Sequence, residues 1–377
     1  MQEPKKTLDI KPEYKPRAVA EPPTSSVVKG PREGFVEDIA INLGLIERRI
    51  AHHDLEFTQM QLGRLTKTTI VVAFIKSVAD GKLAQRIVKR LQELDCDGVL
   101  DSHNLVEHLQ TESAIFRQVG SAEKPDIIAA KLLEGRVAIF VDGSPMVLTL
   151  PYIILEDLQN SDDYYSNHVA ASFKRCVRLF GVFISILLPA FYVAVQLYHY
   201  KIVPISALIT ITNSVLNSPF SPMIEVLFVL VLFEILYEAS LRMPRHLGMA
   251  TSIVGALVLG DTAVKAGLLS STSVLVAALS GITLYIIPDS APQISLLRFF
   301  FCILAAVFGL FGVVIGGIIL ITYLNGLENY GAPYLSPFAP YIKSDSKDAL
   351  LKTSFTNQIM RPKVFNNKNK RRQAGFK

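Results

Sequence analysis

The hydrophobic residues of this 377-residue chain are distributed unevenly. Residues 1–178 mix short apolar stretches with polar ones, as soluble proteins do, whereas residues 179–324 contain almost every long apolar run. A run of about 20 apolar residues is long enough to cross a bilayer as a helix. The pattern therefore predicts a soluble N-terminal portion followed by an α-helical, polytopic membrane domain.

Residues 30–170 are predicted to form a compact α/β domain on the cytoplasmic side. Two segments in it have helical features. Residues 35–50 carry acids near their start and Arg48 and Arg49 near their end, which suits the helix dipole. Residues 83–94 repeat apolar side chains at helical spacing.

The same domain contains two strand patterns. The run TTIVVAFI at 68–75 is short and rich in β-branched residues, which is typical of a buried strand. Residues 136–151 contain two apolar runs around Asp142-Gly143, a strong hairpin pattern. We therefore expect a small sheet with helices packed on it.

Apolar runs in the second half predict the membrane domain, residues 171–325. The first two candidate spans are 179–198 and 223–241, and the last, 297–324, is long enough to tilt across a bilayer. Two further segments, 202–216 and 249–288, leave the count open between four and six spans. We expect four, with 202–216 re-entrant or interfacial. If 249–288 crosses twice, 202–216 has to cross as well.

The two ends of the chain are polar. Residues 1–29 are charged and rich in proline, which predicts a disordered arm without a signal peptide. Residues 326–377 are basic and predict a cytoplasmic tail, because basic segments beside spans stay inside. They show neither a regular interleaving of basic and aromatic residues nor a nucleic-acid-binding fold, so we expect no nucleic acid partner.

Familiar catalytic motifs are absent from the sequence. It has no GxGxxG, P-loop, GxSxG or HExxH pattern, and its three cysteines are too dispersed for a disulfide framework or a metal pair. The run His52-His53-Asp54 suggests a metal but is more typical of a solvated surface. We predict that the chain is not an enzyme and uses neither a cofactor nor a bound metal.

Three carboxylates interrupt the apolar run 223–241, and a carboxylate at mid-membrane costs about 2.5–3.5 kcal/mol on insertion scales. Glu225 lies about 3 Å into the run, at 1.5 Å per residue, and is expected to reach the membrane interface. Glu234 and Glu238 share one helix face deeper in the membrane. They either form a structural stripe, with Arg242 pairing with Glu238, or take part in an ion path.

Residues 249–270 predict a helix with one small, weakly polar face. Its members are Ser252, Gly255, Val258, Leu259 and Thr262. Such a face permits close helix packing, or it lines a narrow water path in a symmetric ring, with Val258 or Leu259 as a hydrophobic gate. Asp261 either pairs with Lys265 or forms an acidic ring that favours cations. Because four to six spans do not easily enclose a conduit within one subunit, a homo-oligomeric ring is the economical arrangement if the chain conducts ions.

Several stretches together resemble one family. They are GPREGFVEDIAINLGLIERRI (30–50), TKTTIVVAFI (66–75), EGRVAIFVDGSPMVLTLP (134–151), EDLQNSDDYY (156–165), NSPFSPMIEVLFVLVLFEILYEASLRMP (217–244), SIVGALVLGDTAVKAGLLS (252–270) and YGAPYLSPFAP (330–340). In this order they resemble the GerA spore germination family, the A subunits of nutrient germinant receptors. The resemblance runs from about Gly30 to Arg361.

The resemblance implies a multi-pass protein of the endospore inner membrane whose N-terminal domain faces the spore core. It implies assembly with a transporter-like B subunit, which binds the germinant, and a lipoprotein C subunit. It also implies ring oligomers that release monovalent cations, with 251–262 lining the pore. The alternative is a non-conducting scaffold, or an A-like paralogue linked to the dipicolinate channel genes. Family members usually carry another soluble subdomain ahead of GPREGF, where this chain has 29 residues.

Overall fold

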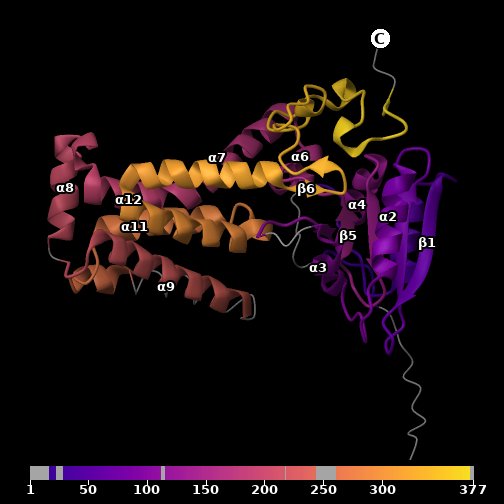
Figure 1. Cartoon of the computed structure of the whole chain (residues 1–377), viewed down its shortest axis with the longest axis horizontal. Coiled ribbons are helices and arrows are strands. Elements are labelled where there is room, and N and C mark those ends of the chain that lie inside the picture. The colour runs from indigo at the N-terminus through magenta and orange to yellow at the C-terminus, as the bar shows by residue number, and fades with distance from the viewer. Residues whose placement is uncertain (1–16, 23–28, 112–114, 217, 243–259, 374–377) are drawn as a thin grey trace, which may run out of the picture.

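A computed structural model describes residues 17–22, 29–111, 115–216, 218–242 and 260–373 of the chain. An α/β domain lies at one end of an elongated molecule, and a bundle of helices extends away from it (Figure 1). The predicted arm lies mostly outside the described residues. Within its described part, the Ala20 carbonyl accepts a hydrogen bond of 3.0 Å from the Gly34 amide.

The α/β domain is built on a five-stranded antiparallel sheet with the strand order β1-β2-β4-β5-β3. The strands are β1 (Leu55–Leu62), β2 (Thr68–Ile75), β3 (Gly120–Ala122), β4 (Val137–Val141) and β5 (Val147–Leu150). The structure confirms the predicted strand at 68–75 and the predicted hairpin, whose two strands are β4 and β5.

Helices cover both faces of this sheet. They are α1 (Ile39–Arg49), α2 (Gly81–Gln92), α3 (Val106–Leu109) and α4 (Pro125–Leu133). Ile70 and Val72 of β2 pack in the cluster that includes α2 and α3, while Val71 and Ala73 pack in the cluster that includes α1 and α4. Because successive strand residues point to opposite faces, a sheet buried on both sides needs apolar residues in succession. This explains the unbroken run TTIVVAFI.

Both predicted helices of this domain are confirmed. α1 begins where the Asp38 carboxylate accepts hydrogen bonds from the amides of Ala40 (2.8 Å) and Ile41 (3.3 Å), and it ends at its two arginines. An acidic N-cap and basic last turn complement the helix dipole. α2 has an equivalent cap in Asp80, whose carboxylate accepts from the Lys82 amide at 3.0 Å.

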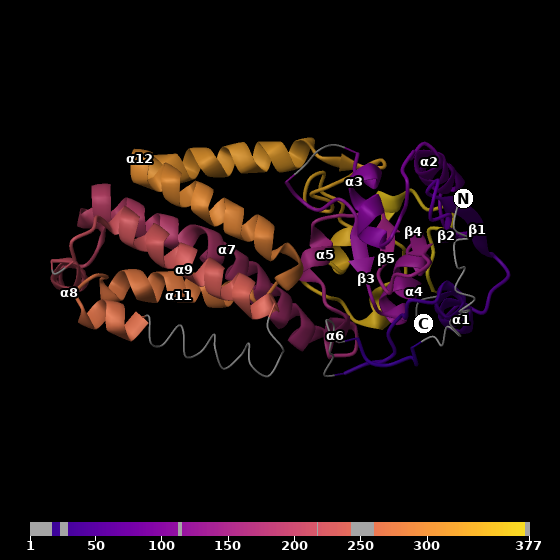
Figure 2. The ribbon, with the colours of Figure 1, turned by 90° about the horizontal axis from the view of Figure 1, so that it is seen from below.

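The helical bundle follows two short connecting helices, α5 (Leu155–Leu158) and α6 (Ser161–Tyr164). Its members are α7 (His168–Tyr198), α8 (Ile205–Val215), α9 (Pro222–Arg242), α11 (Ser271–Leu284) and α12 (Ala291–Gly326). α8 lies at the end farthest from the α/β domain (Figures 1 and 2). Among the described residues, the stretches His168–Tyr198 and Pro288–Gly326 are each long and apolar enough to cross a membrane.

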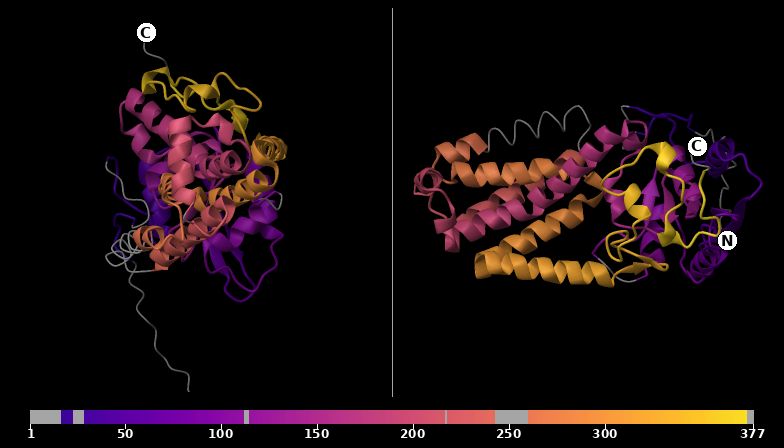
Figure 3. Two further views of the ribbon diagram at one scale, coloured as in Figure 1. Left: turned by 90° about the vertical axis from the view of Figure 1, so that its left-hand side faces the viewer. Right: turned by 90° about the horizontal axis from the view of Figure 1, so that it is seen from above.

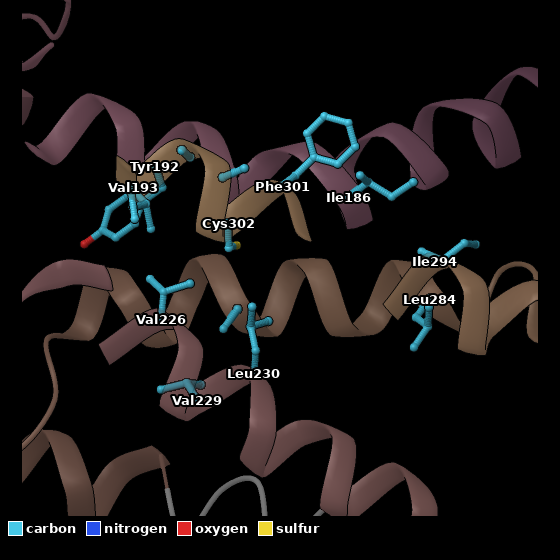
Figure 4. Packing of buried hydrophobic residues seen from close by; sticks show 14 of the residues in the cluster. Ile186, Tyr192, Val193, Val226, Val229, Leu230, Leu284, Ile294, Phe301 and Cys302 are labelled. Carbon is cyan, nitrogen blue, oxygen red and sulfur yellow. The ribbon is translucent and has the colours of Figure 1, made fainter. Parts of the chain in front are cut away.

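The bundle has an apolar core to which four of its helices contribute. Figure 4 shows Ile186 and Val193 of α7 facing residues of α9 and α12, including Leu230 and Phe301, in one cluster with Leu284 of α11. Many large apolar side chains on the outer surface stay exposed, such as Phe180 (66%), Phe228 (52%) and Phe311 (68%). Exposed apolar area of this extent is typical of surfaces that contact lipid or a partner.

The structure contradicts the single tilted span predicted at 297–324. α12 bends back on itself at Gly309 and forms two arms (Figure 2). The bend rests against the end of α7, where the Tyr198 hydroxyl donates to the Ala306 carbonyl at 2.7 Å. A Cβ atom at Gly316 would lie 2.7 Å from Leu304 Cδ1, so this glycine lets the arms pack closely.

Replacing Gly309 with alanine is expected to destabilise the bundle by about 1–3 kcal/mol, because only glycine readily adopts its backbone angles. Its φ is 63° and its ψ is −147°, and an added Cβ would lie 2.9 Å from His199 Cε1. Thermal unfolding of the purified chain in detergent measures the loss. The control is Gly317→Ala, whose added Cβ would meet nothing within 4 Å. A Gly309→Ala chain as stable as this control would contradict the account.

The basic tail folds back onto the α/β domain (Figure 3). It begins with a small hairpin of β6 (Glu328–Asn329) and β7 (Ala332–Pro333), followed by short 3₁₀ turns. The Arg361 guanidinium donates to the Leu133 carbonyl at 2.7 Å, and the Lys368 amide donates to the Val78 carbonyl at 3.0 Å. Val364 and Phe365 are buried against Ile153. The described part of the tail is thus a packed layer of this domain.

Candidate functional site

Most of the predicted small-residue face lies outside the described residues: Ser252, Gly255, Val258 and Leu259. Thr262 is described and exposed. Close to it, Lys265 Nζ lies 2.6 Å from Asp261 Oδ2, and both side chains are more than half exposed. In this single chain Asp261 therefore pairs with Lys265, which was one of the two alternatives. Pore lining by this face stays a prediction.

Glu234 forms an ion pair inside the bundle with Arg298 of α12. Arg298 NH2 lies 3.0 Å from Glu234 Oε2, and the Ser295 hydroxyl donates to the same oxygen at 2.9 Å. The Arg298 side chain is 1% exposed, whereas that of Glu234 is 34% exposed. The pair joins α9 to the first arm of α12. This arrangement matches the structural reading of the carboxylate stripe for Glu234.

The Arg298 guanidinium continues into a chain of buried hydroxyls. Its NH1 donates to the Ser280 hydroxyl at 3.2 Å. Ser280 and Ser185 exchange hydrogen bonds, each hydroxyl donating to the other residue's carbonyl, at 2.7 and 3.0 Å. Carboxylate, guanidinium and hydroxyls thus link α9, α12, α11 and α7. Polar groups that satisfy one another in this way can be held in an apolar bundle.

Glu238 pairs with Arg242 one turn further along α9, as its i, i+4 spacing predicted. Arg242 NH2 lies 2.6 Å from Glu238 Oε1. The side chains are 57% and 79% exposed, so this pair contributes much less to stability than a buried one. The structure therefore separates the two stripe residues: Glu234 pairs with a buried arginine inside the bundle, and Glu238 forms an exposed pair.

Glu225 was expected to extend to the membrane interface, but the structure buries its side chain inside the bundle. It is 0% exposed, and its Oε2 accepts hydrogen bonds from the hydroxyls of Ser270 (2.6 Å) and Ser273 (2.7 Å) at the start of α11. Its position near the helix end suggested access to water. In the folded bundle the first turn of α11 covers that end and supplies hydroxyl donors.

Arg175 of α7 ties the bundle to the α/β domain and the tail. Its side chain is 0% exposed. Nε lies 3.2 Å from Asp163 Oδ2 in α6, while NH1 donates to Asp348 Oδ1 at 2.9 Å and to the Ala349 carbonyl at 2.7 Å. Arg178 donates to both Asp163 oxygens, at 2.6 and 2.9 Å. This arginine cluster therefore joins three parts of the chain.

A cavity of about 430 Å³ lies beside that cluster, between α4, the segment 152–165 and the tail. Lys131 Nζ lies 2.6 Å from Glu156 Oε2 in its wall. Burial lowers the pKa of Lys131, against the opposing effect of Glu156. Arg117 NH1 lies 3.4 Å from Asp289, directly before α12. The cavity wall thus contains a direct electrostatic contact between the α/β domain and the turn that leads into α12.

The stability of the arginine cluster formed by Arg175 and Arg178 is expected to depend on Asp163 at acid pH. Burial raises the pKa of Asp163, but hydrogen bonds and charge from Arg178, helped by Arg175, outweigh it and hold the pKa below 3.8. Because the unfolded carboxyl takes up its proton first, the stabilisation is complete above about pH 4 and is lost as pH falls through the lower folded pKa.

Denaturation curves recorded as the pH is lowered from about 5 test this expectation. The loss of stability below about pH 4 should be smaller in Asp163→Asn than in the original chain. Asp162→Asn, at the neighbouring position, should keep the original pH dependence. An unchanged acid slope in Asp163→Asn would remove Asp163 from the explanation.

Sequence reasoning missed Arg298 and Arg175 as site residues. The sequence did point to Arg298, because a lone arginine in the apolar run 297–324 needs a carboxylate partner in the membrane. The signal for Arg175 was weaker, because it looked like one of three basic residues flanking the first span. His52, His53 and Asp54 lie together at the surface, with both histidines exposed.

Known proteins match the chain over almost its whole length. Residues 6–364 match the Bacillus/Clostridium GerA spore germination protein family. Among curated proteins, the chain is 38% identical to Spore germination protein KA of Bacillus subtilis, over 95% of this chain and 66% of that protein. It is 36% identical to the uncharacterized membrane protein YfkQ of the same species, over 95% and 70%. It is 35% identical to Spore germination protein GerQA of Bacillus cereus, over 89% of this chain and 68% of that protein.

A solved structure is also similar to part of the chain. It is the N-terminal domain of the A subunit of the Bacillus megaterium spore germinant receptor GerK3, with 40% identity over 31% of this chain and 93% of that one, and a TM-score of 0.26. The chain spans about two thirds of the length of the curated relatives named above. The family is one of receptor subunits and not of enzymes, in agreement with the missing catalytic motifs. This chain belongs to the GerA spore germination protein family.

Proposed function

We propose that this chain is the A subunit of a spore nutrient-germinant receptor. In this proposal it forms a homo-oligomeric, ligand-gated channel that releases monovalent cations at the start of germination. Its partners are a transporter-like B subunit and a lipoprotein C subunit. It lies in the inner membrane of the endospore with the α/β domain and the tail on the cytoplasmic, or core, side.

The observation that carries the proposal is the family match over residues 6–364, which includes both the soluble and the helical parts. The helical part is held together by polar groups centred on Glu234 and Arg298, which is compatible with a bundle that lies in a membrane. The α/β domain and the tail lie at the same end of the bundle, which favours an even number of crossings within the predicted four to six (Figure 3).

The test is cation flux through liposomes that contain this chain with its B and C partners. Germinant is expected to start release of a monovalent cation, and no release with all three subunits and germinant present would overturn the channel proposal. Val258→Ala is expected to raise the resting cation leak, because the smaller side chain widens the proposed hydrophobic constriction. Leu257→Ala is the matched control, because at 100° per residue it falls on the opposite face of the predicted helix.

The alternative is a non-conducting scaffold or an A-like paralogue. The similarity to YfkQ, which is described as an uncharacterized membrane protein, is compatible with this alternative. Spores with Glu234→Gln and enlarged Gly255 distinguish the two readings. Normal potassium release from those spores, together with loss of release when the α/β domain is deleted, would favour the scaffold.

A further inference from the structure

The buried carboxylate of Glu225 is surrounded by hydroxyl oxygens. Its Oε2 accepts from Ser270 Oγ at 2.6 Å and from Ser273 Oγ at 2.7 Å, and these two hydroxyls lie 2.7 Å apart. Its Oε1 is also buried, yet it accepts no hydrogen bond from the described part of the chain. A buried carboxylate oxygen without a donor is costly and points to a missing partner.

Further hydroxyl oxygens lie next to the two serine hydroxyls. The Tyr192 hydroxyl lies 2.8 Å from Thr272 Oγ1 and 3.2 Å from Ser273 Oγ. Ser214 Oγ of α8 lies 3.0 Å from the same threonine oxygen. The cluster therefore draws oxygens from α7, α8, α9 and α11. It lies at the end of the bundle farthest from the α/β domain, where α9 begins (Figure 2).

Glu225 differs from the other described acids of the bundle in its lack of a cation. Glu234 has Arg298, Glu238 has Arg242 and Asp261 has Lys265. Within the described ranges, no lysine, arginine or histidine forms an ion pair with Glu225. The N-terminus of α11 offsets part of a negative charge. An ionised carboxylate at such a site still requires a full positive charge to balance it.

We propose that Glu225, Ser270 and Ser273 bind a dehydrated monovalent cation of the sodium or potassium class, with Thr272 and Tyr192 as further oxygen ligands. Oxygen-only ligands select hard cations. One carboxylate among neutral hydroxyls balances a single positive charge, whereas calcium sites usually combine several carboxylates. In the bound state the serine hydroxyls keep their protons directed at Oε2 and offer their oxygen lone pairs to the ion, which also contacts Oε1. The site requires no conduction by the chain and so goes beyond the proposed function.

Thermal unfolding of the purified full chain in detergent tests the site. Sodium or potassium chloride is raised from about 1 to about 100 mM against choline chloride at constant ionic strength, because a ligand of the native state raises Tm with its concentration. We expect Tm to rise with sodium or potassium but not with choline. Glu225→Gln should lose the rise, and Ser273→Ala should shift it to about tenfold higher salt. Glu238→Gln, which alters an exposed pair, should keep it.

Binding of radioactive sodium or rubidium to the same preparations measures the site directly, with about one ion per chain expected. A Tm that responds equally to choline, or that responds to pH but to neither cation, would overturn the proposal. Full binding by Glu225→Gln would overturn it too. If that variant does not fold, the expected loss of affinity in Ser273→Ala decides the matter. The measurements use neither partners nor flux, so failure of the channel proposal leaves their outcome unaffected.

Discussion

Replacing Glu234 with alanine is expected to destabilise the chain by about 3 kcal/mol, because it leaves the Arg298 guanidinium buried without its counter-charge. Arg298 is 1% exposed, and its ion pair with Glu234 is 3.0 Å long. Neither Ser280 nor Ser295 can replace the lost charge. Chemical or thermal unfolding of the purified chain in detergent measures the effect.

Two comparisons separate this effect from a general loss of helix stability. Glu238→Ala removes a carboxylate from the same helix, but one paired at the surface, and should cost less than about 1 kcal/mol. The double variant Glu234→Leu with Arg298→Met removes both charges and should recover most of the stability. A double variant that is less stable than Glu234→Ala would show that the ion pair itself stabilises the bundle beyond the burial cost of the charge.

Replacing Arg175 with alanine is expected to cost about 3–5 kcal/mol and to loosen the tail from the bundle. The substitution leaves Asp163 with Arg178 as its remaining arginine partner and removes the donors to Asp348 Oδ1 and the Ala349 carbonyl. Trypsin should then cleave faster at Lys343 and nearby basic sites of the tail, because local unfolding exposes them. The rate of cleavage and the unfolding midpoint are the two measurements.

Lys174→Ala is the matched control for this variant. Lys174 is the neighbouring cation on α7 and is exposed, so its loss should change stability by less than about 0.5 kcal/mol. Arg175→Lys should recover only part of the stability, because a single ammonium cannot match the directions of a guanidinium. Equal trypsin sensitivity of the tail in Arg175→Ala and Lys174→Ala would remove Arg175 from the account of tail docking.

Local pattern was sufficient for the elements of the α/β domain. The strand at 68–75 could be predicted because a sheet covered on both faces requires successive apolar residues. The helix ending at Arg49 could be predicted because its cap and its charges act within a few residues of chain. The spacing of Glu238 and Arg242 likewise implied their pair, since residues four apart meet on a helix.

Partners distant in sequence could not be predicted in the same way. The sequence indicated that Glu234 needs a basic partner but did not identify the partner. In the structure this partner is Arg298, which lies 64 residues further along the chain. Glu225 seemed able to reach water because its depth was measured along one helix. In the bundle, Ser270 at the start of α11 lies against it.

The sequence by itself determined which segments are apolar enough for a bundle, where the α/β domain lies and which family the chain resembles, because these follow from composition and short-range spacing. Only the tertiary structure decided that one apolar run bends at Gly309, that the tail packs on the α/β domain, and which acids of the bundle have a basic partner. Each of those outcomes depends on side chains from separate helices meeting in space. A buried charge is satisfied or left unsatisfied by neighbours that distance along the chain does not predict.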